Sequence, residues 1–254
     1  MTASPPPAVT RPDLEAGLRG IGLVSGDTVL VHSSLRSFGR VEGGAETVIA
    51  ALQAVLGPHG TLVMPTLTLG AAEDHVVFDV RRSPSTSGAL TEVFRRQPGV
   101  HRSHHPFSAA AAWGWGAREL TAHHDGLPCS LTSPYGQVYL RAGYSLFLGT
   151  GLGCNTIFHV AEELEHPPYL RYAVFPDAVV VDDGGRSQRV TAFRYNCYQT
   201  GIRRHLERME GVFQAEGVLR EAWVGLSRWR LLAASDNVTL SRQVLRERPE
   251  LILW

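Results

Sequence analysis

Apolar residues in the first quarter of the chain alternate between the periods of helices and strands. A helical face over residues 10–21 is followed by a short, β-branched apolar run over 28–32, typical of a buried strand. A second apolar helical pattern over 48–56 ends at Gly57-Pro58, and residues 61–64 again read as a strand. Strand, helix and strand at this spacing predict a parallel, right-handed βαβ unit.

The same alternation continues to the end of the chain. Residues 182–185, Asp-Asp-Gly-Gly, lie between two apolar runs and predict a β-hairpin. The remaining predicted elements are helices over 86–97, from Pro134, over 155–165, near 201–214 and near 236–247, and strands over 108–113, 145–148, 174–181, 188–193, 217–223 and 229–233. We therefore expect an α/β fold: one domain over 10–254, with a largely parallel central sheet flanked by helices and a hairpin-containing C-terminal part. The Pro- and Ala-rich residues 1–9 are expected to be disordered.

Composition narrows the class of protein. Of the 254 residues, 44% are hydrophobic, which fits a soluble globular chain. Lys plus Arg equals Asp plus Glu, 24 against 24, so charge gives no support for a nucleic-acid or membrane partner. The three cysteines show no paired spacing, and no segment reads as a secretory signal or a membrane span. These features predict a cytoplasmic protein.

The loop after the first predicted strand is a candidate anion site. It contains Ser33, Ser34 and the glycines 39, 43 and 44, between a parallel strand and a helix N-terminus. Free N–H groups at a helix N-terminus suit a phosphate, and Arg36 and Arg40 add positive charge. The alternative interpretation is an ordinary glycine-rich loop with solvated arginines.

Two histidine segments are candidates for chemistry. His159 and Glu162 are three residues apart near the start of a predicted helix, so they share a face, and the carboxylate can orient the imidazole as a general base. An ordinary surface His–Glu pair is the alternative. His105 precedes a strand of small residues and can point into a cleft, whereas the neighbouring histidines 101 and 104, and also 123 and 124, are expected at the surface. Cys154 is a weaker candidate nucleophile for a Cys–His pair.

Several of these segments, in this order, resemble the aminoglycoside 3-N-acetyltransferase family. The run His159-Val160-Ala161-Glu162 is similar to the family's His-Leu-Ala-Glu. The other matching segments lie at residues 26–35, 41–44, 57–66, 83–88, 94–100, 102–108, 111–114 and 133–136. An ordered series of short matches over roughly 12–175 is more specific than any one motif.

The resemblance implies direct acetyl transfer from acetyl-CoA to a small-molecule amine, as in aminoglycoside antibiotic resistance, on a fold distinct from the common N-acetyltransferase fold. His159 would be the base, Glu162 would orient it, and His105 would line the acceptor side. CoA would lie against the first loop, and neither a metal nor a covalent enzyme intermediate is required. The residues that the resemblance assigns to CoA are His32, Ser33, Ser34, Leu35, Arg36, Gly43, Gly44, Thr66 and Ser108, the last two as oxyanion donors.

One departure concerns the acceptor. Relatives that act on aminoglycosides tend to carry an Asp-rich stretch after this helix, whereas residues 193–198 here contain no acid, and the only other candidate loop has Glu73 and Asp74. A CoA-dependent N-acyltransferase for another amine is therefore a second hypothesis. A non-catalytic CoA-binding protein and a metal-dependent hydrolase are two further hypotheses. The oligomeric state, a homodimer included, stays open.

Overall fold

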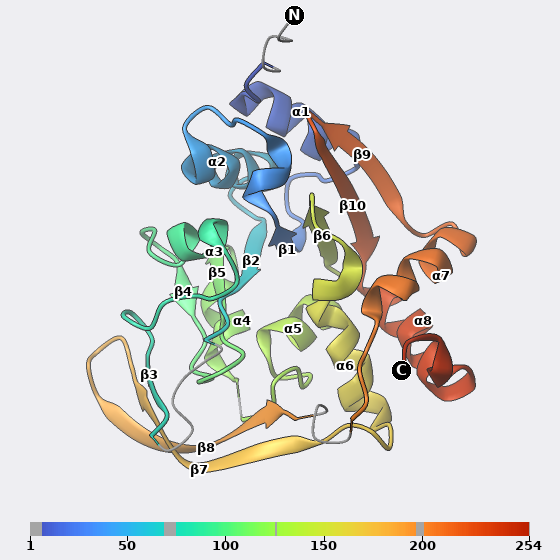
Figure 1. Ribbon diagram of the computed structural model, residues 1–254. Helices are drawn as coiled ribbons and strands as arrows, with labels where there is room; N and C mark the ends of the chain where they lie inside the picture. Colours follow the sequence, from blue (N-terminus) through green and yellow to red (C-terminus); the bar gives the residue numbers. More distant parts are fainter. Residues whose placement is uncertain (1–6, 69–74, 125, 197–200, 254) are drawn as a thin grey trace, which may run out of the picture.

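A seven-stranded mixed sheet runs through the computed structural model, which describes residues 7–68, 75–124, 126–196 and 201–253 (Figure 1). The strand order is β4-β5-β2-β1-β6-β10-β9. Their bounds are β1 Thr28–Ser33, β2 Thr61–Pro65, β4 His101–Arg102, β5 Ala110–Gly114, β6 Tyr144–Leu148, β9 Arg220–Val224 and β10 Ser227–Ala233. The expected parallel arrangement is found at the centre, where β1 pairs with β2 and β6, while the outer pairs are antiparallel.

Helices cover both faces of this sheet because alternate strand residues point to opposite sides. Val29 and Val31 pack on the side of α1, α2 and α3, whereas Leu30 packs on the side of α4, α5, α6 and α8. The helices are α1 Arg11–Gly20, α2 Gly44–Leu56, α3 Ala89–Phe94, α4 Ala117–Ala122, α5 Pro134–Leu140, α6 Thr156–Glu165, α7 Met209–Ala215 and α8 Ala234–Glu247. None of the helices in the described ranges has the length and apolar character needed to cross a membrane. The α/β class expected from the periodicity is confirmed.

A second, three-stranded sheet lies at one end of the molecule (Figure 1). It consists of β3 Val77–Asp79, β7 Tyr172–Val181 and β8 Ser187–Tyr195. The predicted hairpin is confirmed: β7 and β8 pair antiparallel around the Asp-Asp-Gly-Gly turn. Their register shifts between Phe175 and Ala178, where Pro176 interrupts the strand, since proline cannot donate to the ladder.

The helix expected near 201–214 begins only at Met209, after the short 3-10 turn η4 Leu206–Arg208. Arg204 instead forms an antiparallel bridge with Leu253, and the backbone N–H of His205 donates to the carbonyl of Ile252 at 2.8 Å. The C-terminal residues thus hold this segment extended beside α6. The short elements β3, β4 and α4 are not part of the sequence-based prediction.

Candidate active site

The carboxyl ends of β1, β2 and β6 meet at one edge of the sheet, because these three strands are parallel. Helix α6 begins at this edge. The side chain of Asn155 accepts a hydrogen bond from the N–H of Phe158, and its amide is bonded to Asn237 of α8 at 3.0 Å. This double attachment fixes the first turn of α6, which carries Thr156 and His159, against the core.

His159 and Glu162 form the pair that their spacing predicts. His159 Nδ1 lies 2.6 Å from Glu162 Oε2. The Glu162 side chain is fully buried and that of His159 is 17% exposed. Because a carboxylate only accepts, the hydrogen of this bond belongs to Nδ1, which leaves Nε2 as the nitrogen able to accept a proton. The geometry is that of an oriented imidazole base.

Two further side chains hold the Glu162 carboxylate. Arg204 Nη1 donates to Oε2 at 2.8 Å, and the Tyr169 hydroxyl donates to Oε1 at 2.6 Å. Burial raises the pKa of Glu162, but the electrostatic effect of His159, the His159 hydrogen bond and the Arg204 guanidinium together outweigh it, so the net pKa lies below the usual 4.5. The carboxylate is therefore ionised and accepts three hydrogen bonds.

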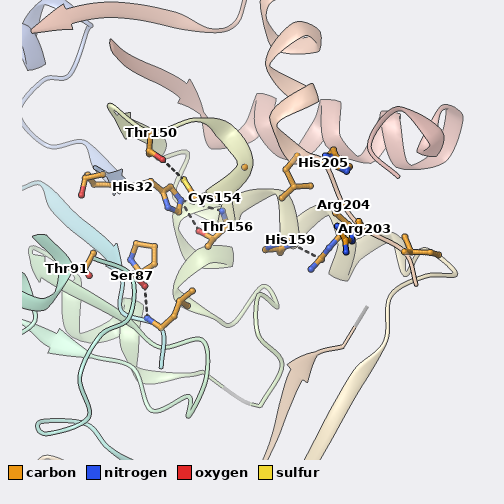
Figure 2. A pocket seen from close by; sticks show the side chains of 17 residues that line it. His32, Ser87, Thr91, Thr150, Cys154, Thr156, His159, Arg203, Arg204 and His205 are labelled. Carbon is orange, nitrogen blue, oxygen red and sulfur yellow. Dashed lines mark hydrogen bonds between the residues drawn. The ribbon is translucent and has the colours of Figure 1, made fainter. Parts of the chain in front are cut away.

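Two cavities meet at His159. The larger, about 780 Å³, opens along the carboxyl edge of the sheet, and the smaller, about 390 Å³, lies toward β8. Leu67, Thr156, His159 and Arg204 line both. Figure 2 shows His159 beside Arg204, with His32, Cys154 and Thr156 grouped next to it. An imidazole at the junction of two cavities can contact two ligands that enter separately.

His32 lies one residue before the end of the central strand β1 and lines the larger cavity. Its ring stacks on Phe147 at 5.2 Å, and Nε2 lies 3.2 Å from Thr156 Oγ1 and 3.5 Å from the Thr156 nitrogen. Since the backbone N–H can only donate, Nε2 is the accepting nitrogen. Burial, and secondarily the charge of His159, lowers the pKa of His32 to about 3, so its imidazole is neutral.

The smaller cavity is bounded by the end of β8. The Tyr195 ring lies 5.0 Å from the His159 ring, and its hydroxyl donates to Glu163 Oε1 at 2.8 Å. The Tyr172 hydroxyl of β7 donates to the other oxygen of Glu163 at 2.7 Å. Adjacent glutamates of α6 therefore hold the His159 ring and the hairpin beside it.

Of the residues assigned to CoA from the sequence, His32 and Ser33 line the larger cavity and Ser108 lines the smaller one. The other residues assigned in this loop line neither cavity. Ser34 and Leu35 begin the 3-10 turn η1 Leu35–Phe38, and Arg36 is exposed. Gly43 and Gly44 adopt positive φ values of 69° and 61° at the start of α2. A phosphate-binding role for this loop stays a prediction.

Thr66 and His105 occupy positions that differ from their predicted roles. The Thr66 hydroxyl is buried, donates to the Ala109 carbonyl at 3.2 Å and accepts from Arg102 Nε at 3.0 Å. His105 is 1% exposed, and its Nδ1 accepts from the N–H groups of Phe107 and Ser108. Its Nε2 donates to the Gly126 carbonyl, so the ring holds its own turn and lines neither cavity beside His159.

The remaining histidines and cysteines are distributed as follows. His123 is exposed as predicted, but His124 is buried, with Nδ1 2.9 Å from Ser103 Oγ and Nε2 3.0 Å from the Pro128 carbonyl, which corrects its predicted surface position. Cys154 is exposed, but desolvation by the surrounding protein raises the pKa of its thiol, which stays protonated beside the larger cavity. Among the described residues no group of three or more potential metal ligands gathers. Glu73, Asp74 and Cys197 lie outside the described residues.

The sequence and the fold of this chain are similar to those of known acetyltransferases. A family model described as aminoglycoside 3-N-acetyltransferase matches residues 30–246. Aminoglycoside N(3)-acetyltransferase IV from Salmonella sp is 34% identical over 236 residues, covering 92% of this chain and 88% of the relative.

Two solved structures are similar over nearly the whole chain. A histidine-to-alanine mutant of aminoglycoside acetyltransferase AAC(3)-IVa, in complex with apramycin, has a TM-score of 0.82 and 31% identity, with 98% of this chain and 96% of that chain covered. The binary complex of AAC-IIIb with CoASH has a TM-score of 0.85 and 26% identity, with coverage of 95% and 98%.

Proposed function

The chain belongs to the aminoglycoside 3-N-acetyltransferase family and is an acetyltransferase, and we propose that it moves the acetyl group of acetyl-CoA to an aminoglycoside amine with His159 as general base. The observation that carries this proposal is the 2.6 Å bond between His159 Nδ1 and the buried Glu162 carboxylate, at the junction of two cavities. An imidazole held in this way exposes one basic nitrogen where both substrates can meet.

The proposed reaction is one direct transfer. As the acceptor nitrogen bonds to the thioester carbonyl carbon, its proton passes to His159 Nε2, and the carbonyl oxygen takes the negative charge. When the tetrahedral intermediate collapses, the carbon–sulfur bond breaks, and the CoA thiolate leaves and recovers the proton from the imidazolium. Glu162 stabilises that imidazolium while it lasts, because its ionised oxygen lies 2.6 Å from Nδ1.

The larger cavity is the proposed site of the acetylated pantetheine arm. Its volume, about 780 Å³, falls within the usual range for small-molecule sites, and it runs along the carboxyl edge of parallel strands. His32, Ser33, Ser87 and Thr91 supply polar groups along its walls. The smaller cavity then receives the acceptor amine, opposite the thioester across His159.

A thiol-release assay with acetyl-CoA tests the proposal, using apramycin and gentamicin as first acceptors. His159→Ala should lower kcat by about 10²–10⁴-fold, the range that general-base catalysis contributes, with acetyl-CoA affinity changed only a few-fold. His166→Asn is a matched control, since His166 is exposed at the end of the same helix with a positive φ that Asn tolerates. A His159→Ala enzyme with wild-type turnover would exclude the base assignment.

A second candidate acceptor is an amine that carries an anionic group. Arg194 lines the smaller cavity, with its guanidinium stacked over the rings of Phe107 at 5.3 Å and Phe175 at 5.1 Å. A guanidinium fixed in this way recognises carboxylates and phosphates well. Parallel assays with ω-amino carboxylates decide between the two candidate acceptors. If the acceptor carries an anionic group, ω-amino carboxylates should have a higher kcat/KM than apramycin, and Arg194→Leu should remove that difference.

A further inference from the structure

Arg204 has a fixed position at the centre of the site although it comes from outside the motif helix. The bridge to Leu253 holds its backbone, and its side chain is 15% exposed. Nη1 lies 2.8 Å from Glu162 Oε2 and 3.4 Å from His159 Nδ1, and the guanidinium lies 5.5 Å from the centre of the Tyr195 ring. The same side chain lines both cavities. Its permanent charge is therefore part of the base's immediate environment.

A buried carboxylate beside an imidazole favours the imidazolium, which cannot accept a proton. A guanidinium sharing the same carboxylate oxygen opposes this in two ways: it neutralises the carboxylate, and it repels a second positive charge at a distance of 3.4 Å. Going beyond the proposed function but resting on it, we propose that Arg204 is a positioning residue that keeps His159 neutral and its Nε2 free to accept the acceptor's proton.

The other titratable groups around His159 are less suited to keeping its imidazole neutral. His32 on β1 is neutral because burial lowers its pKa to about 3, and the Tyr195 hydroxyl on β8 is directed to Glu163. Burial raises the pKa of Cys129, and local desolvation raises the pKa of Cys154, so both thiols stay uncharged. The further titratable side chains that line the two cavities are Tyr135, Arg194, Arg203 and His205. Arg204 alone among the described residues pairs with the carboxylate that orients the base and also contacts His159.

The test compares Arg204→Met with Arg204→Lys over a range of pH, at saturating acetyl-CoA and acceptor. Methionine removes the charge while keeping much of the volume, so the acidic limb of the kcat profile should move up by about one pH unit. Activity relative to the wild type should then fall roughly tenfold at pH 6 and recover at pH 8.5. Lysine keeps the charge and should leave the limb near its wild-type position. A loss that is equal at every pH, or no loss, would overturn the proposal.

A second measurement does not depend on turnover. NMR titration of ¹⁵N-histidine-labelled protein, with the His159 signals assigned from His159→Gln, follows the proton directly. In Arg204→Met the imidazole should protonate at a higher pH than in the wild type, and coinciding titration curves in folded protein would refute the role of Arg204. If instead the wild type turns over no acceptor while the titration shift is present, the proposed function fails and the electrostatic role of Arg204 stands.

Discussion

Replacing Glu162 with Gln tests the centre of the site, because it keeps the shape and removes the charge. Three donors now converge on the carboxylate: His159 Nδ1, Arg204 Nη1 and the Tyr169 hydroxyl. A glutamine oxygen replaces only one of the two carboxylate oxygens, and its NH₂ group would face a donor on the other side. If that NH₂ group faces Nδ1, the imidazole adopts the opposite tautomer, with a hydrogen on Nε2, and the base is lost.

Two magnitudes follow from this geometry. The rate should fall by about 10²–10⁴-fold in kcat, the full range attributed to an oriented general base. Removing one partner of a buried ion pair costs about 3–5 kcal/mol, and the 15% exposure of Arg204 places the cost near the lower end. For a chain of this size, about 3 kcal/mol corresponds to a fall in Tm of roughly 6–12 °C.

Thiol release at saturating substrates measures the first quantity, and thermal unfolding at pH 7 measures the second. Since the folded pKa of Glu162 is lowered, its contribution is fully present above about pH 4.5 and is lost as the pH falls through the folded pKa. Glu165→Gln is the control on the same helix, because its partners Arg242 and Arg246 lie away from the cavities. A Glu162→Gln enzyme that retains kcat within threefold of the wild type would refute the reasoning.

Two further outcomes are expected. The pKa of His32 is about 3 in the folded protein and about 6.5 in the unfolded chain, so the unfolded state gains a proton first and acid destabilises the fold. Between pH 6.5 and 5, the free energy of unfolding of His32→Gln, measured with urea, should fall by about 2 kcal/mol less than that of the wild type. Parallel pH curves for the two proteins would contradict this. Glu163→Gln leaves one of the Tyr172 and Tyr195 hydroxyls without its acceptor, which costs about 1–2 kcal/mol. It should raise the KM of the acceptor more than it lowers kcat in initial-rate assays; the reverse pattern would show that the hairpin does not shape the acceptor site.

The local part of the site could be predicted because helical spacing alone brings His159 and Glu162 together. The strands β1, β2 and β6 could likewise be predicted from their apolar runs. Their parallel pairing brings their carboxyl ends to one edge of the sheet. Arg204 carries no comparable signal. Its position depends on a pairing with the C-terminal residues, and that contact joins segments about 50 residues apart.

The direction in which individual side chains point could not be predicted from the sequence. His105 stands next to a small-residue strand, but its nitrogens are used within its own turn and by Gly126. Thr66 lies one residue beyond β2, yet buried Arg102 takes its hydroxyl, an interaction that follows from the antiparallel pairing of β4 with β5. Sequence proximity to a strand end therefore located the region and left the contacts undetermined.

The two adjacent carboxylates of α6 hold different parts of the site. Glu162 holds the His159 ring, while Glu163 anchors Tyr195, whose neighbours Arg194 and Asn196 also line the smaller cavity. Changes at those two neighbours can alter the shape and charge of the cavity wall while the tyrosine anchor stays in place. Under the proposed function, substitutions at this one strand end change acceptor selectivity while the His159–Glu162 hydrogen bond on α6 stays intact.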